Sequence, residues 1–189
     1  MRLAAITLTL LLAGCGSSTP LPDWRLNASQ ALEAFQRDYL NGDTRASESD
    51  FTRARAELAR TGREDLLARA ELVRCAVRTA SLEFDDCPGF ERLRTGAGAE
   101  ELAYAQYLSG KGPHAASEDP LSRLVAAGVS LKTGGIDPAA IDAAIEVASA
   151  QGWRRPLLAW LGVQAKRAED AGDRETAAKI RRRMDLISG

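Results

Sequence analysis

Apolar side chains recur every three or four positions along most of the chain, which is the spacing of one face of an α-helix. The clearest of these stripes consists of Leu66, Ala70, Val73, Val77 and Ala80. Outside the N-terminal segment, no stretch alternates between apolar and polar residues as a half-buried strand would, and runs of β-branched residues are missing. We therefore predict an all-α fold built from antiparallel helical hairpins.

Capping residues predict where the helices begin and end. Asp119-Pro120 and Asp137-Pro138 each place an Asp N-cap before a Pro at the first helical position, and Asp173 is expected to cap the last helix. Asn27, followed three residues later by a glutamine, resembles a capping box and predicts the start of the first helix, while Pro156 predicts another start. The glycines expected to end helices are Gly42, Gly62, Gly134 and Gly172.

The last two predicted helices carry small residues at defined positions. Ala165 lies in the first of them, Gly172 in the turn and Ala177 in the second, and this pair resembles a tetratricopeptide repeat (TPR). The pair departs from that family at Ala168 and Arg181, where the repeat has aromatic side chains. The resemblance implies stacked helical hairpins.

Residues 107–112 contain a second, isolated motif. They read Tyr-Leu-Ser-Gly-Lys-Gly, which is similar to the Y-x-x-G-x-G turn of Sel1-like repeats, another helical-hairpin family. Together the two resemblances cover less than half of the chain. They imply a short TPR-like α-solenoid whose concave face binds a peptide or a helix, and an irregular helical bundle is the alternative fold.

The N-terminal segment has a different pattern from the rest of the chain. Met1-Arg2 supplies a positive charge, and residues 3–13 are apolar apart from Thr7 and Thr9. This run is shorter than the ~20 residues that a bilayer-spanning helix requires, whereas a charged start and a short apolar core are typical of a secretory signal. We therefore expect residues 1–14 to be a signal peptide that does not belong to the fold.

The apolar run ends in Leu12-Ala13-Gly14-Cys15, which resembles the lipobox of bacterial lipoproteins. In that family the cysteine thiol receives diacylglycerol, the chain is cut just before the cysteine, and the new amino group is acylated with a fatty acid such as palmitate. The resemblance implies that Cys15 is the lipidated first residue of the mature protein and that its acyl chains anchor it in a membrane. Because Gly16 rather than an aspartate follows, the resemblance further implies the outer membrane of the cell envelope, with the protein facing the periplasm.

The remaining chain is expected to divide into a tether and a domain. Residues 15–25 are predicted to be the lipidated cysteine and a flexible tether, and residues 26–189 a single α-helical domain of ordinary size. Trp24 lies near the end of this tether. It is expected to pack against the first helix, and a position at the membrane interface is the alternative.

The charge balance and the cysteine content limit the kinds of ligand and of functional site that we expect in this protein. The 25 basic and 26 acidic residues nearly balance, with a pI of about 5.9, so the composition does not favour nucleic-acid binding. Cys75 and Cys87 remain once Cys15 is acylated, and an exported protein is expected to join them in a disulfide. Cys75 lies opposite the apolar stripe, so the bridge is predicted to hold the following loop over the outer face of its helix. The only histidine, His114, has no partner at a metal-binding or catalytic spacing, so no metal or cofactor is expected.

No catalytic motif is recognisable in the chain, and an enzyme is not expected. The leading hypothesis is a scaffold that binds another envelope protein, as an assembly factor or an accessory subunit. Aromatic and arginine side chains dominate the binding energy of many interfaces. On this ground the candidate partner-binding residues are Tyr104, Trp153, Arg154, Arg155 and Trp160.

Two other hypotheses remain open from the sequence. The acidic loop with Glu83, Asp85 and Asp86 is the candidate site of an enzyme that acts on cell-wall glycan, or of a glycan binder, because glycosidases use paired carboxylates. The other hypothesis is a small structural lipoprotein with no specific ligand.

Overall fold

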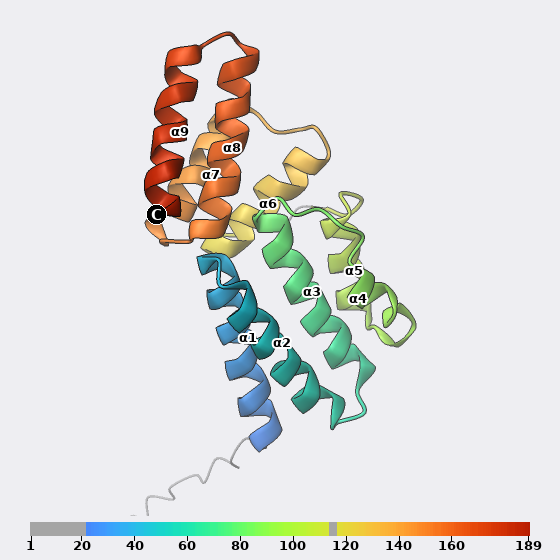
Figure 1. Cartoon of the computed structure of the whole chain (residues 1–189). Coiled ribbons are helices and arrows are strands. Elements are labelled where there is room, and N and C mark those ends of the chain that lie inside the picture. The colour runs from blue at the N-terminus through green and yellow to red at the C-terminus, as the bar shows by residue number, and fades with distance from the viewer. Residues whose placement is uncertain (1–21, 114–116) are drawn as a thin grey trace, which may run out of the picture.

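The computed structural model describes residues 22–113 and 117–189, and within these ranges the chain forms helices joined by turns and short loops, without a strand (Figure 1). The predicted all-α class is therefore confirmed. In chain order the helices are α1 (Asp23–Asn41), α2 (Thr44–Ala59), α3 (Glu64–Ala80), α4 (Pro88–Glu91), the 3₁₀ helix η1 (Arg94–Gly96), α5 (Ala99–Leu108), α6 (Pro120–Lys132), α7 (Pro138–Ala150), α8 (Arg154–Asp170) and α9 (Arg174–Ser188).

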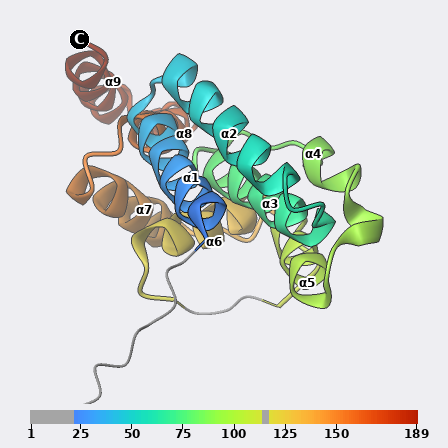
Figure 2. The same ribbon diagram turned by 90° about the horizontal axis from the view of Figure 1, so that it is seen from below.

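Helix α3 lies at the centre of the arrangement. The α1–α2 hairpin packs on one side of it, and α5 and α6 pack on another (Figures 1 and 2). From α6 onwards each helix packs against the next one along the chain, up to the α8–α9 hairpin at the C-terminus. Among the helices of the two described ranges, none combines the length and the apolar character needed to cross a bilayer.

Two hydrophobic clusters use different faces of α3. Ala70 and Val77 belong to the cluster shared with α1 and α2, where the rings of Phe35 and Phe51 pack with centroids 4.9 Å apart. Cys75 belongs to the second cluster, shared with α5 to α8, and is only 4% exposed. The prediction that Cys75 lies on an outer face of its helix is therefore wrong. One apolar stripe identifies one packing partner of a helix, and α3 has partners on both sides.

Helices α3 and α6 meet in a tight contact at Gly128. A Cβ atom at this position would lie 2.3 Å from the carbonyl oxygen of Thr79, so the packing leaves no room for a side chain. The hydroxyl of Thr79 in turn donates a hydrogen bond to the carbonyl oxygen of Cys75 at 3.0 Å. Gly128 therefore sets how closely the C-terminal helices approach the centre of the fold.

Most helix starts lie where the local sequence predicts them. The carboxylates of Asp119 and Asp137 accept hydrogen bonds from backbone N–H groups three residues later, at 2.8 and 2.7 Å, and each is followed by Pro at the first helical position. Asp173 caps α9 in the same way, at 3.0 Å. These three predictions are confirmed, because each depends only on neighbouring residues.

Two predicted starts are wrong. Helix α1 begins at Asp23 instead of near Asn27, because Pro22 is its N-cap and the carboxylate of Asp23 is favourable in a first turn. The domain therefore starts before residue 26, and Trp24 lies inside α1, partly buried against the first cluster. Helix α8 begins at Arg154, and Pro156 lies within its first turn, where a missing N–H breaks no helical hydrogen bond.

Two arginines at the start of α8 join it to the connection between α1 and α2. Arg154 Nε donates to the carbonyl oxygen of Asn41 at 3.1 Å. Arg155 donates from Nε to the carbonyl oxygen of Tyr39 and from Nη2 to Thr44 Oγ1, both at 2.7 Å. In a linear stack each repeat contacts only its neighbours, so this contact across more than 110 positions of sequence is a feature of a bundle.

Candidate partner-binding groove

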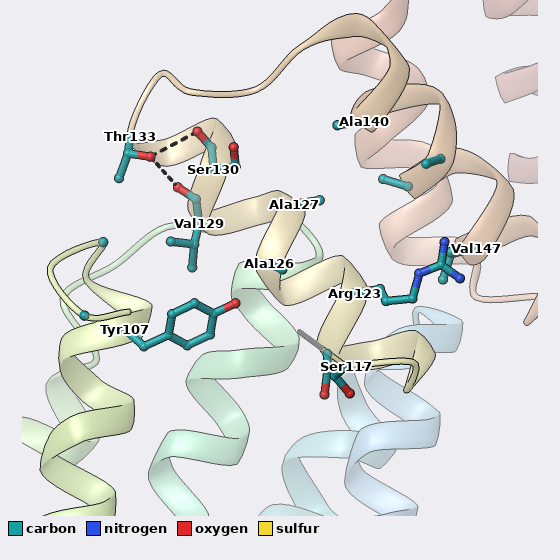
Figure 3. A pocket seen from close by; sticks show the side chains of 15 residues that line it. Tyr107, Ser117, Arg123, Ala126, Ala127, Val129, Ser130, Thr133, Ala140 and Val147 are labelled. Carbon is teal, nitrogen blue, oxygen red and sulfur yellow. Dashed lines mark hydrogen bonds between the residues drawn. The ribbon is translucent and has the colours of Figure 1, made fainter. Parts of the chain in front are cut away.

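An open groove runs between α6 and α7 and reaches the turn that follows α5 (Figure 3). Its cavity volume of about 590 Å³ lies within the range of ligand-binding clefts, roughly 300–1,000 Å³. We call it the α5–α7 groove. Its apolar lining is made of the small side chains Ala126, Ala127, Val129, Ala140, Ala143, Ala144 and Val147. Its polar lining is made of Tyr107, Ser117, Ser122, Arg123, Ser130 and Thr133.

The groove forms because α6 and α7 direct their large apolar residues elsewhere. Leu124 and Val125 of α6 are buried in the second cluster, as are Ile141 and Ile145 of α7. The residues that line the groove are mostly alanine and serine, whose side chains are too short to fill the space between the two helices. The cavity is therefore a consequence of residue size along two well-formed helices.

The turn after α5 closes one end of the groove and requires its glycines. Gly110 has φ of +79°, and a Cβ atom there would also lie 2.4 Å from Cγ2 of Thr133. A Cβ atom on Gly112 would lie 2.7 Å from the backbone nitrogen of Tyr107. Both glycines of the Tyr-Leu-Ser-Gly-Lys-Gly motif thus allow the turn to fold back on α5 and to touch the end of α6.

Two polar residues of the lining, Thr133 and Arg123, differ in how their side chains are placed. The hydroxyl of Thr133 donates to the carbonyl oxygens of Val129 and Ser130, at 3.0 and 3.2 Å, and is occupied within α6. Arg123 is exposed, and among the described residues that line the groove it is the one with a charged side chain. Figure 3 shows it extending from α6 on the side of α7. The groove therefore presents one cation beside an apolar wall.

Two tyrosines of α5 pack against each other, with ring centroids 5.8 Å apart. Tyr107 lines the groove, whereas Tyr104, one turn earlier, lines a separate hollow with Arg69 and Leu72 of α3. Burial, with smaller effects of Tyr107 and Asp119, raises the pKa of Tyr104 to about 12, although 37% of this residue is exposed. Tyr104 therefore stays neutral across physiological pH, and its ring contacts that of Tyr107.

The structure separates the five candidate partner-binding residues of the sequence. Tyr104 is exposed and contacts Tyr107, but it lines a separate hollow between α5 and α3. Trp160 is fully buried, and its indole N–H donates to the carbonyl oxygen of Ala80 at 3.1 Å, so its predicted contact with a partner is wrong. The side chain is a core residue because α8 places it against α3.

The other three candidates lie where α8 meets α1. Trp153 is partly buried and packs against both hydrophobic clusters. Arg154 and Arg155 make the hydrogen bonds to the α1–α2 connection described above, and the guanidinium of Arg155 also lies 4.3 Å from the ring centroid of Tyr39. These side chains hold helices together, and they do not form one surface with Tyr104.

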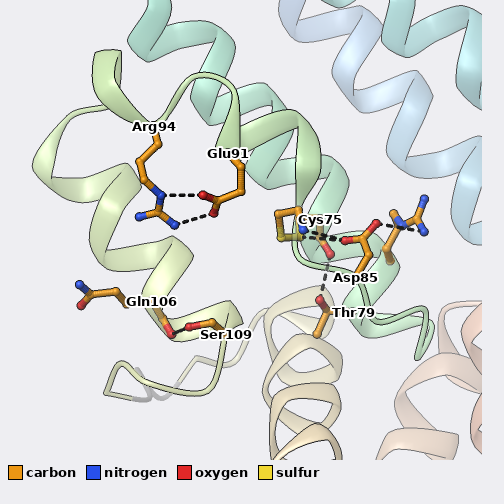
Figure 4. The surroundings of a disulfide bond; sticks show 9 residues. Cys75, Thr79, Asp85, Glu91, Arg94, Gln106 and Ser109 are labelled. Atoms are coloured by element: carbon orange, nitrogen blue, oxygen red, sulfur yellow. Dashed lines mark hydrogen bonds and ion pairs between the residues drawn. A yellow bond between two sulfur atoms is a disulfide. The ribbon is translucent and has the colours of Figure 1, made fainter.

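The acidic loop is held by arginines. Glu83 pairs with Arg155 at 3.3 Å and with Arg78 at 3.8 Å, and Asp85 pairs with Arg78 at 3.1 Å. Asp85 also accepts a hydrogen bond from the backbone N–H of Cys87 at 2.9 Å (Figure 4). Asp86 is exposed. Two of the three carboxylates therefore have structural partners, and Asp85 and Asp86 line a smaller pocket of about 370 Å³ together with Glu91.

The disulfide joins Cys75 to Cys87, with Cα atoms 5.7 Å apart (Figure 4). It connects α3 to the start of α4, where Cys87 has φ of +48°. Asp85 lies within 3.9 Å of Cys75 Sγ, so two sulfurs and a carboxylate are close together. Metals bind cysteine as thiolate, and both sulfurs are used in the disulfide, so this cluster lacks a ligand set while it is oxidised.

The sequence did not identify Tyr107 or Arg123 as site residues. A signal for the groove was nevertheless present, because Ala126, Ala127 and Ser130 form a small-residue surface on α6 beside its core-facing stripe. Cys15, the predicted lipidation site, lies outside the described residues. No family model, no curated protein and no solved structure matches the chain.

Proposed function

We propose that this protein is a lipoprotein of the bacterial outer membrane, anchored through Cys15 and facing the periplasm, whose helical domain binds another envelope protein. In this proposal it acts as an assembly factor or an accessory subunit. The observation that carries the binding role is the α5–α7 groove, which is open, mostly apolar and not filled by any described part of the chain.

The groove favours an amphipathic helix of the partner as its occupant. Small residues on two helices allow a third helix to approach closely, and its apolar residues at every third or fourth position would enter the cavity. The exposed Arg123 favours a partner helix that carries an acidic residue opposite it. Tyr107 extends the apolar contact on the α5 side.

The proposed anchor rests on sequence. The positively charged start, the short apolar run and the Leu-Ala-Gly-Cys motif occur in the order that lipoprotein signals require. The disulfide between Cys75 and Cys87 supports an oxidising compartment such as the periplasm, because disulfides are rare in the cytosol.

The test of the binding role is site-specific crosslinking in cells. A photoreactive amino acid replaces Ala143, which lines the groove, and the matched control replaces Ala178, an exposed alanine of α9. We expect a discrete adduct from position 143 that is missing from position 178. The crosslinked protein is then identified and purified, and its affinity is measured for the wild type and for Ala143→Trp, which fills the groove.

The expected result is at least about a tenfold loss of affinity for Ala143→Trp, or 1.4 kcal/mol, with no change for Ala178→Trp. Equal affinity of both variants would show that the partner does not use the groove. The anchor is tested separately: Cys15→Ser is expected to move the protein from the membrane fraction to the soluble fraction, and mass spectrometry is expected to find acyl chains on Cys15 of the wild type.

A further inference from the structure

The described chain begins close to the proposed lipid anchor. Pro22, the N-cap of α1, is only seven positions after Cys15. Seven residues span at most about 25 Å even when fully extended. Helix α1 alone has 19 residues and is therefore about 28 Å long. The length of this segment therefore allows the first turn of α1 to lie at the membrane surface and keeps it within about 25 Å of the proposed anchor.

The first turn of α1 carries side chains that suit the layer of lipid headgroups. Leu26 is 49% exposed, although it is a large apolar residue. Trp24 is partly exposed, and the guanidinium of Arg25 lies 5.7 Å from its ring centroid. Trp is enriched at the interface between lipid and water, and Arg places its stem along apolar surface while its charge stays in the polar layer.

The direction of these side chains also fits. The Cα–Cβ bonds of a helix lean toward its N-terminus, so Trp24, Arg25 and Leu26 lean toward the linker that leads to Cys15. Figures 1 and 2 show the start of α1 at the same end of the molecule as the α2–α3 turn.

The charges of the α2–α3 turn are largely compensated. Arg60 pairs with Glu57 at 3.2 Å, and Arg63 pairs with Asp65 at 2.5 Å. Because these pairs cancel, apolar side chains rather than net charge would hold this end of the molecule on lipid. The contact is therefore expected to depend little on ionic strength.

We propose that the first turn of α1 rests in the headgroup layer of the membrane that holds Cys15, with Trp24 and Leu26 inserted in it. This inference rests on the proposed lipid anchor. It adds that the domain has a fixed membrane-facing end, formed by the start of α1 and the α2–α3 turn.

The experiment uses the full-length protein, purified with its lipid and placed in phosphatidylcholine vesicles whose acyl chains carry bromine, a quencher of Trp fluorescence. We expect the emission to fall relative to vesicles without bromine, and Trp24→Phe to abolish the fall. Trp160 is fully buried, and Trp153, the N-cap of α8, lies beside the α1–α2 connection at the other end of α1, so neither is expected to contribute. Leu26→Glu is expected to reduce the quenching, whereas Leu186→Glu, which changes the 84% exposed leucine of α9, leaves it unchanged.

The outcomes separate the two proposals. A protein that carries acyl chains and floats with the vesicles, but whose quenching is the same in the wild type and in Trp24→Phe, overturns the membrane contact and leaves the anchor standing. A protein whose mass shows no acyl chains and that does not float overturns the anchor, and with it this inference. Equal quenching in Leu26→Glu and the wild type overturns the insertion of Leu26.

Discussion

The contact between α3 and α6 at Gly128 predicts that Gly128→Ala destabilises the fold. The new Cβ atom would lie 2.3 Å from the carbonyl oxygen of Thr79 and 3.1 Å from its Cγ2, whereas ordinary van der Waals contact begins near 3.4 Å. The two helices would have to separate by about 1 Å. Shortening the side chain of Thr79 cannot relieve the overlap, because the main obstacle is a backbone atom.

The magnitude follows from two opposed effects. Replacing Gly by Ala inside a helix stabilises it by about 0.5–1 kcal/mol, and overpacking a well-filled interior costs about 1–3 kcal/mol. The overlap at Gly128 is severe, so we expect a net loss of about 1–2 kcal/mol in the free energy of unfolding. For a protein of this size the melting temperature would fall by about 3–6 °C.

A matched control is the same substitution at Gly162 in α8. A Cβ atom there meets only the terminal methyl of Met184, at 4.0 Å, so Gly162→Ala is expected to stabilise by about 0.5–1 kcal/mol. Both variants are compared with the wild type by urea unfolding followed by circular dichroism. If Gly128→Ala proves as stable as Gly162→Ala, the close packing of α3 on α6 is refuted.

Three further predictions concern other parts of the fold. The double variant Cys75→Ala/Cys87→Ala loses a bridge between residues 12 positions apart and should lose about 3 kcal/mol in urea unfolding; an unchanged midpoint would contradict this. Asp137→Ala removes the cap of α7 and should lower the free energy of unfolding by about 1 kcal/mol, whereas Asp137→Asn should keep most of the capping stabilisation. Tyr104 should ionise near pH 12 in an absorbance titration, against 10.0 for the unperturbed side chain. Because its folded pKa is raised, its contribution to stability should be complete below pH 10 and be lost as the pH rises from there to about 12; ionisation near pH 10 would refute its burial.

Features that depend on neighbouring residues were predictable from the sequence. The caps at Asp119, Asp137 and Asp173 are such features, since each side chain bonds an N–H group three residues away. The apolar stripe of α3 likewise predicted the face that packs on α1 and α2, through Ala70 and Val77. The start of α1 was missed because a capping-box pattern at Asn27 competes with Pro22 and Asp23, and the structure uses the latter pair.

Features that depend on distant residues were not predictable. Cys75 is buried because α5 and α6 cover the face of α3 that a single stripe leaves open. Trp160 is a core residue because α8 packs near Ala80. The local sequence around an Arg or a Trp does not show whether the side chain contacts a partner protein or another helix of its own chain. Arg155 contacts its own chain. The groove was not predictable either, because it lies between α6 and α7 and depends on how these two helices pack.

The arginine contacts between α8 and the α1–α2 connection have a consequence for how the protein comes apart. An array of repeats without such contacts frays from its ends, because each unit depends only on its neighbours. Here the eighth helix holds the turn between the first two through Arg154 and Arg155. Loss of the C-terminal hairpin would therefore leave the carbonyl groups of Tyr39 and Asn41 without these hydrogen bonds. We expect the N-terminal and C-terminal helices to unfold together for this reason.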